Sequence, residues 1–142
     1  MQPIKVAIAD GDRSGRVACE RLLRDVPGVR LVAGMATWQD VIPTTRKIKP
    51  RILLCSFGLA ADAGHSLLLT LRSECPQTRV ILLIDHTVHE DRLMPALING
   101  AVGFLPRRAL RFQLPSAVRG ADRGEAWVPR KMLGTILAHY LR

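Results

Sequence analysis

The sequence predicts a single α/β domain built on a parallel β-sheet with helices on both faces. Short apolar runs of strand length alternate with segments whose apolar residues recur at helical spacing. The run at residues 52–56 is apolar almost throughout, which is typical of a strand buried on both faces. With 142 residues, 48% of them hydrophobic, the chain is large enough for one core without disulfides or metals. Right-handed crossovers then place helices on both sides of the sheet.

The first strand and helix set the pattern for the rest of the chain. Residues 4–9 are almost entirely apolar and end at Asp10-Gly11-Asp12, as a buried parallel strand does where it enters a loop. Asp12 is suited to cap the helix that follows. Apolar residues then recur at helical spacing until Pro27-Gly28 ends the helix: Val17, Cys19, Leu22, Leu23 and Val26.

The same alternation continues to about residue 125. We expect further strands at residues 29–35, 52–56, 80–84 and 102–105, and helices at residues 38–49, 63–74, within 90–99, and 112–123. Such a series fits the flavodoxin-like strand order 2-1-3-4-5. Functional groups then lie where strands end, near the switch point between strands 1 and 3: Asp10-Gly11-Asp12, Ser56-Phe57-Gly58, Ile84-Asp85-His86 and Leu105-Pro106-Arg107.

Three prolines fall inside predicted helices, where a proline lacks a donor and costs about 3 kcal/mol. They are Pro43, Pro95 and Pro115, and at least some of these helices should begin late or bend. For Pro95 the hypothesis is that residues 86–94 are largely loop and that Pro95 stands near the first turn of a shortened helix. The alternative is a complete helix kinked at Pro95.

The tail of the chain predicts one more amphipathic helix. Pro129 fits a first helical position, and Met132, Leu133, Ile136, Leu137, Tyr140 and Leu141 follow at helical spacing. We therefore divide the chain into a domain at residues 1–125 and a C-terminal helix at residues 126–142. Its apolar face either folds back on the domain or faces a partner as a linker helix, and the sequence leaves both open.

Composition narrows the classes of protein. The net charge of +9 fits an anionic partner or simply a basic proteome, and an aromatic content of 4% argues against a base-stacking surface. No apolar run is long enough for a membrane span and no signal peptide is visible, so we expect a soluble, cytoplasmic protein without membrane contact. Cys19, Cys55 and Cys75 have no metal-site spacing and are expected as reduced thiols, the first two in the core.

Several segments resemble the receiver domain of bacterial two-component response regulators, most closely those of the NarL/LuxR type. They are VAIADGD, CERLLRDVPGVRLV, KPRILLCS, NGAVGFLPR and RGADRGEAWVP, and the resemblance covers nearly the whole chain. It implies a domain that phosphorylates itself on an aspartate after strand 3. An acidic pair after strand 1 would hold Mg²⁺, and a Thr or Ser after strand 4 and a Lys after strand 5 would bind the phosphoryl group.

The residues that match these positions depart from the family pattern. Asp10 matches the first acidic residue, but Gly11 occupies the second position and cannot coordinate a metal through a side chain. Asp12 is either a substitute ligand or, more naturally, a helix cap. Ser56 stands at the phosphoacceptor position, where a hydroxyl without a neighbouring base is not a nucleophile. Three further residues complete this degenerate pocket. Ile84 stands at the position of the Thr or Ser, Phe104 at that of an aromatic residue that moves on phosphorylation, and Arg107 at that of the Lys.

Other expectations follow from these departures. We expect the Arg107 side chain to contact a carboxylate at the position where metal and phosphate would have bound. Asp10 is the first candidate partner, and Asp12 and Asp85 are the others. Such a contact should hold the domain in one conformation. Phe104 is interpreted as a fixed packing residue. No catalytic residue, metal or cofactor is expected, and a metal pair at His86 and His89 is disfavoured because loop histidines are common.

The function predicted from the sequence is a pseudo-receiver, a non-enzymatic module that acts in signal transduction and transcription regulation without being phosphorylated. It would form a homodimer through receiver helices, either the first and fifth or the face of helix 4, strand 5 and helix 5, or bind another protein. DNA would be read only through a helix-turn-helix domain absent from these residues. The alternatives are a stand-alone protein–protein adaptor and a receiver that is still phosphorylated. A nucleotide-binding enzyme is disfavoured, because the glycine-rich patterns that bind phosphate are absent after the first strand.

Overall fold

Five parallel strands form the centre of the domain. The computed structural model describes residues 2–64, 66–85 and 90–140. The sheet has the order β2-β1-β3-β4-β5, and every neighbouring pair is parallel. This confirms the predicted fold class and strand order. The strands are β1 (Ile4–Ala9), β2 (Val29–Met35), β3 (Ile52–Ser56), β4 (Arg79–Ile84) and β5 (Ala101–Pro106).

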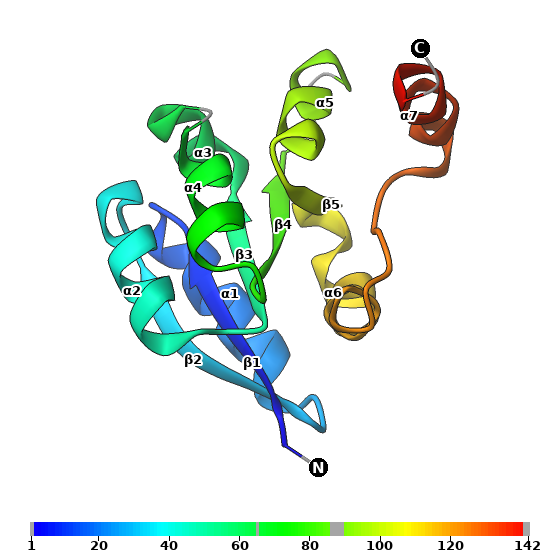
Figure 1. The fold of residues 1–142 in the computed structure, drawn as a ribbon. Coiled ribbons are helices and arrows are strands. Elements are labelled where there is room, and N and C mark those ends of the chain that lie inside the picture. The colour runs from blue at the N-terminus through cyan, green and yellow to red at the C-terminus, as the bar shows by residue number, and fades with distance from the viewer. Residues whose placement is uncertain (1, 65, 86–89, 141–142) are drawn as a thin grey trace.

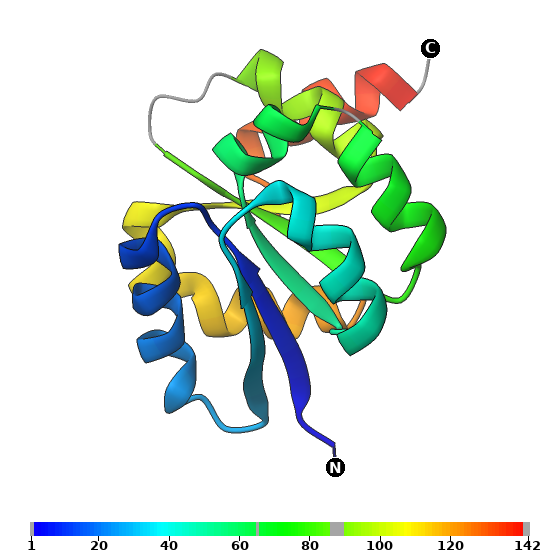
Figure 2. The same ribbon diagram turned by 90° about the vertical axis from the view of Figure 1, so that its left-hand side faces the viewer.

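Helices cover both faces of the sheet, as Figures 1 and 2 show. One face carries α1 (Arg13–Arg24) and α6 (Leu110–Asp122). The other carries α2 (Val41–Ile48), α3 (Phe57–Ala63), α4 (Ser66–Glu74), α5 (Glu90–Ile98) and α7 (Leu133–Tyr140). Short 3₁₀ turns precede α2, α6 and α7, namely η1 (Trp38–Asp40), η2 (Arg107–Ala109) and η3 (Arg130–Met132).

Alternate residues of each central strand supply the two cores. In β1, Val6 and Ile8 pack beneath α1 and α6, whereas Ala7 and Ala9 face the larger helical layer. All five residues of β3 are buried. Both faces of these strands are therefore apolar, which explains the continuous apolar runs in the sequence. The sheet is thus rigid where its carboxyl ends meet the loops.

The chain forms a helix directly after β3, where the sequence analysis placed a loop and a single later helix at residues 63–74. Helix α3 begins at Phe57 with Ser56 as its N-cap, and Gly64 ends it at a φ of 82°. Leu59 and Ala60 are buried against the core, so burial stabilises this short alanine-rich helix. The expectation of one helix here was wrong.

The hypothesis for Pro95 was also wrong within the described residues. Helix α5 starts at Glu90 and runs through Pro95 to Ile98, so the segment from Glu90 onward is not loop. Leu93 and Ala96 are buried against the sheet, and this burial offsets the hydrogen bond that proline removes. The part of the hypothesis that concerns residues 86–89 lies outside the described residues, as does the His86–His89 pair.

The other two prolines behave differently from each other. Pro43 is the third residue of α2, which begins only at Val41 after a 3₁₀ turn. The predicted late start is therefore confirmed, since a proline in the first turn removes no intrahelical donor. Pro115 lies inside α6, whose helix begins at Leu110, two residues earlier than predicted.

The C-terminal segment returns along the edge of the sheet and packs on it. The Trp127 carbonyl accepts a hydrogen bond from Phe104 N–H at 2.7 Å, and Trp127 N–H donates to the Val102 carbonyl at 3.0 Å. Met132 is buried and Ile136 packs against the core, so this helix folds back, while Leu133 and Leu137 stay exposed. Within the part of the chain described here, no helix has the length and apolar character that crossing a bilayer demands.

Candidate functional site

An open cavity of about 760 Å³ lies at the carboxyl ends of the central strands. Five of the predicted site residues line it, namely Asp10, Gly11, Asp12, Ser56 and Arg107. Ile84 and Phe104 do not line it; both are buried in the core that faces α2–α5. The sheet therefore brings most of the predicted set together, as the strand order requires.

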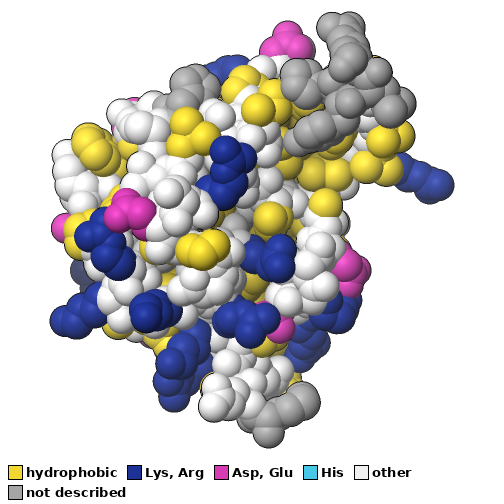
Figure 3. Space-filling model, in the orientation of Figure 1, with side chains coloured by type: hydrophobic (Ala, Val, Ile, Leu, Met, Phe, Trp, Pro, Cys, Tyr) yellow, Lys and Arg dark blue, Asp and Glu magenta, His cyan; other side chains and the backbone are white. Residues whose placement is uncertain are grey.

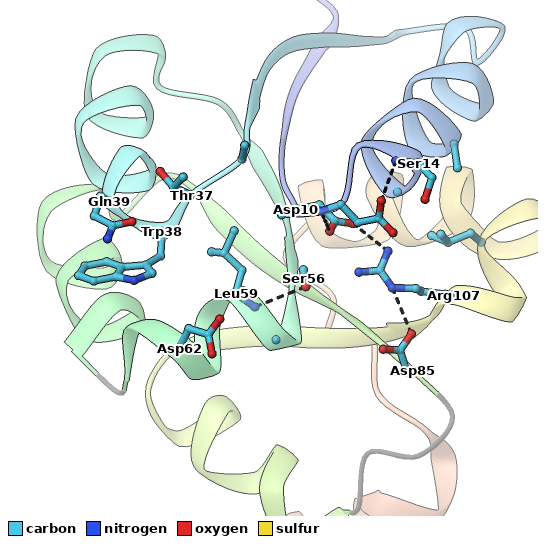
Figure 4. A pocket seen from close by; sticks show the side chains of 17 residues that line it. Asp10, Ser14, Thr37, Trp38, Gln39, Ser56, Leu59, Asp62, Asp85 and Arg107 are labelled. Carbon is cyan, nitrogen blue, oxygen red and sulfur yellow. Dashed lines mark hydrogen bonds and ion pairs between the residues drawn. The ribbon is translucent and has the colours of Figure 1, made fainter.

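Arg107 occupies the centre of this site between two carboxylates (Figure 4). Its Nη1 lies 2.9 Å from Asp10 Oδ2, and its Nε lies 3.3 Å from Asp85 Oδ1. The side chains of Asp10 and Arg107 are only 3% and 27% exposed, whereas that of Asp85 is 68% exposed. The predicted contact with Asp10 is thus confirmed, and it is the better shielded of the two.

The backbone around Asp10 holds its carboxylate in place. Asp12 N–H donates to Asp10 Oδ1 at 3.0 Å, so each carboxylate oxygen of Asp10 has its own partner. Arg16 Nη1 donates to the Asp10 carbonyl at 2.7 Å. A Cβ on Gly15 would lie 2.1 Å from Asp10 Oδ2 and 3.0 Å from Arg107 Nη1. The ion pair therefore lies against α1 at a point where only glycine leaves room.

Asp12 acts as the N-cap of α1, as the sequence predicted. Its Oδ1 accepts a hydrogen bond from Ser14 N–H at 3.0 Å. Hydrogen bonds from Ser14, with smaller contributions from Arg107 and Arg16, hold the pKa of the Asp12 carboxyl below its usual value. Asp12 is consequently ionised at neutral pH and engaged with the helix.

Ser56 has a structural partner at the predicted phosphoacceptor position. Its hydroxyl accepts from Leu59 N–H at 3.4 Å and caps α3, and the residue is 8% exposed. No other hydrogen-bond partner of this hydroxyl is found among the described residues. No base is hydrogen-bonded to this hydroxyl among the described residues, so none is placed to take its proton while the oxygen attacks an electrophile.

Ser56→Ala tests this role by its effect on stability. Removing the cap leaves an N–H of α3 without its partner, and we expect the free energy of unfolding to fall by about 0.5–1 kcal/mol. Urea denaturation followed by circular dichroism measures it. Ser116→Ala, on the exposed side of α6, is the control and should change stability by at most about 0.5 kcal/mol. A Ser56→Ala protein as stable as the wild type would contradict the capping role.

The cysteine thiols close to the site are unreactive as nucleophiles. Burial, with a smaller contribution from the Asp10 carboxylate, raises the pKa of Cys55, the residue before Ser56, to about 12. Burial likewise raises the pKa of Cys19 to about 11. Both thiols remain protonated at neutral pH and are poor nucleophiles. All three cysteines are free and buried, and burial was predicted for Cys19 and Cys55.

The donor set does not suit the divalent cation that the receiver resemblance implies. Gly11 offers no side chain, and the guanidinium of Arg107 is already bound to the Asp10 oxygen that would otherwise ligate an ion. Asp12 is turned to the N-terminus of α1. Among the residues with described positions, no group of three or more potential metal ligands is found. A hard cation needs several free oxygens, which this arrangement lacks.

Sequence reasoning missed four residues that shape the site. Gly15 and Arg16 lie against Asp10, and Trp38 and Asp62 line the far side of the cavity (Figure 4). A glycine within a predicted helix was a usable signal, because it often marks a close approach of another group. Arg16 carried no signal, because its contact joins α1 to the loop after β1, and Trp38 and Asp62 carried none, because their places depend on the loop after β2 and on the unexpected helix α3.

No family model matches the chain, whereas comparison with individual proteins finds many relatives. It is 25% identical over 123 residues to the uncharacterized transcriptional regulatory protein YxjL of Bacillus subtilis, covering 87% of this chain and 56% of that protein. It is 23% identical over 127 residues to the response regulator UvrY of Escherichia coli, covering 88% and 57%. The chain thus spans little more than half the length of these relatives.

Solved structures agree on the fold. A LuxR-family two-component response regulator from Aurantimonas superposes with a TM-score of 0.83 at 18% identity, covering 99% of this chain and 100% of that one. The receiver domain of RcsB from Salmonella enterica gives 0.82 at 17% identity, covering 94% and 98%. The strand order, these superpositions and the sequence similarity to response regulators agree along the chain. The chain has the fold of a receiver domain and is similar in sequence to response regulators.

Proposed function

We propose that this receiver domain works without being phosphorylated and transmits a signal by binding, not by catalysis. The observation that carries the proposal is the ion pair between Arg107 and Asp10, which fills the position of metal and phosphate with groups of the chain itself. Ser56 and Gly11 support it, because neither supplies the carboxylate that phosphotransfer needs. Asp10, Gly11, Asp12, Ser56, Ile84, Phe104 and Arg107 are then a degenerate pocket without catalytic residues.

The output of such a domain is proposed from its relatives. Proteins similar to it are named as response regulators and as a transcriptional regulatory protein. We infer a role in transcription regulation, with DNA contacted through a separate helix-turn-helix domain. Homodimerisation through the receiver helices and a role as a protein–protein adaptor are the two ways in which a binding output would operate, and oligomeric state distinguishes them.

Phosphate donors test the proposal directly. The protein is incubated with Mg²⁺ and acetyl phosphate, or with beryllofluoride, and followed by intact mass and amide NMR. We expect no gain in mass and no shifts at Asp10, Ser56 or Arg107, because the guanidinium excludes the cation and no carboxylate is placed to attack. A phosphoryl adduct or shifts that require Mg²⁺ would overturn the proposal.

A reconstructed pocket is the matched positive control. The triple variant Gly11→Asp, Ser56→Asp, Arg107→Lys restores the second acidic residue, the phosphoacceptor and the lysine that the family resemblance implies, and we expect it to gain the mass of one phosphoryl group with acetyl phosphate. Ser56→Asp alone should gain nothing, since Arg107 still occupies Asp10. Phosphorylation of that single variant would show that the ion pair does not block the site.

A further inference from the structure

Helix α6 exposes an aromatic side chain on a surface rich in arginine. Phe112 is 79% exposed, more than any other large hydrophobic side chain that the structure describes. The inner face of α6 is filled by Leu114, Val118 and their neighbours, so the core does not need Phe112. Burial of such an exposed aromatic ring under an apolar group is favourable, because it removes apolar surface from water.

Arginines flank this ring without local counter-ions. Arg111 and Arg119 lie in α6, next to Phe112 and seven residues after it, and Arg108 lies just before α6 in the 3₁₀ turn η2. All four residues are exposed. In the described part of the chain, neither Arg108 nor Arg111 has an ion pair. Arg119 donates only to the Pro27 carbonyl, at 2.9 Å. We call this set, Arg108, Arg111, Phe112 and Arg119, the α6 face.

The α6 face is positively charged at the end of the helix where acidic residues are usually favoured. The first turn of α6 has no acidic residue, and Ala109 provides no side-chain cap. Arg108 and Arg111 therefore add to the positive end of the helix dipole, an arrangement that stability alone disfavours. Figure 3 shows Lys and Arg side chains spread over the side of the molecule that it presents, with acidic side chains among them. The uncompensated charge marks this surface as one arranged for a partner.

We propose that the α6 face binds an acidic protein segment that places an apolar side chain on Phe112. Aromatic residues and arginine are both enriched in protein interfaces. A second copy of the chain fits poorly, because a two-fold interface would set this face against itself and bring arginine against arginine. The phosphates of a nucleic acid would pair with the arginines, but they would not cover the Phe112 ring.

This inference takes from the proposed function only the idea that the domain acts by binding a partner. It adds the chemical character of that partner. The α6 face lies outside the pocket of Asp10 and Ser56. The phosphate-donor experiment therefore reports on the pocket alone, and a binding experiment on α6 reports on the partner alone. Either proposal can fail while the other stands.

The test uses the full chain and three labelled probes in fluorescence anisotropy. They are an acidic peptide of about 20 residues with leucines at helical spacing, polyglutamate of the same length, and a duplex DNA. We expect the leucine-containing peptide to bind most tightly, and Phe112→Ala to weaken that binding about tenfold or more. Arg108→Glu with Arg111→Glu should abolish it. Phe112→Ala should fold normally, which circular dichroism checks, because the ring is exposed.

Controls on the opposite side of the sheet separate a specific surface from general basicity. Leu69→Ala and Lys47→Glu change an exposed apolar and an exposed basic residue on α4 and α2, and neither should alter binding by more than about twofold. The proposal is overturned if the leucine-containing peptide does not bind. It is equally overturned if DNA or polyglutamate binds as well and Phe112→Ala has no effect, or if Phe112→Ala dissociates a wild-type dimer in light scattering.

Discussion

Arg107→Ala is expected to lower the free energy of unfolding by about 3 kcal/mol. The substitution leaves the Asp10 carboxylate, whose side chain is 3% exposed, without the cation that it contacts. The Asp12 N–H remains as a partner of one oxygen, but a single hydrogen bond does not replace a counter-ion. Chemical denaturation monitored by circular dichroism measures the loss.

A double-mutant cycle assigns this loss to the ion pair. Asp10→Asn in the Arg107→Ala background removes the unpaired charge and should restore about 1–2 kcal/mol, because an amide is cheaper to bury than a carboxylate. Arg108→Ala, on the adjacent exposed residue, is the matched control and should change stability by about 0.5 kcal/mol or less. Equal losses for Arg107→Ala with and without Asp10→Asn would show that the pair is not coupled.

Gly103→Ala is expected to have a comparable effect at the far edge of the sheet, with a loss of about 3 kcal/mol. A Cβ at this position would lie 2.2 Å from the Trp127 carbonyl oxygen and 2.8 Å from its carbonyl carbon. The segment at Trp127 must then move away from β5, which breaks its hydrogen bonds to Phe104 and Val102. Thermal denaturation should show a lower midpoint, and hydrogen exchange should speed up at the Phe104 and Trp127 amides.

The matched glycine for this experiment is Gly134 in α7. A Cβ there meets no atom within 4 Å, and the position is helical. Gly134→Ala should therefore leave stability unchanged or raise it by up to about 1 kcal/mol. If Gly103→Ala were as stable as Gly134→Ala, the segment at Trp127 would not be held against β5 in solution.

Several features of the site could be foreseen from residue types and spacing. Because carboxyl ends of parallel strands meet at one edge, Asp10, Ser56 and Arg107 had to converge once the strands were identified. The resemblance to receiver domains then predicted that Arg107 would contact a carboxylate, with Asp10 as the first partner and Asp12 or Asp85 as others. The role of Gly15 was not foreseen, since the distance between a helix and a side chain from another loop is not encoded in local spacing.

The errors came from competition between local preference and burial. Proline disfavours a helix locally, yet α5 runs through Pro95 because Leu93 and Ala96 gain more by packing on the sheet. Helix α3 was missed because its helix is short, and its stability comes from Leu59, Ala60 and the Ser56 cap. In both cases tertiary contacts decided between conformations that the local sequence left close in free energy.

The sequence by itself determined the fold class, the strand order and which residues follow the ends of the strands, because apolar periodicity and chain connectivity can be read along the chain. Only the tertiary structure decided the partners of those residues. It showed Arg107 bound to Asp10 and Asp85, Ser56 used as a helix cap, and the tail bound to the edge of β5. It also left Phe112 among uncompensated arginines, since whether a side chain is covered or exposed depends on groups brought together from distant parts of the chain.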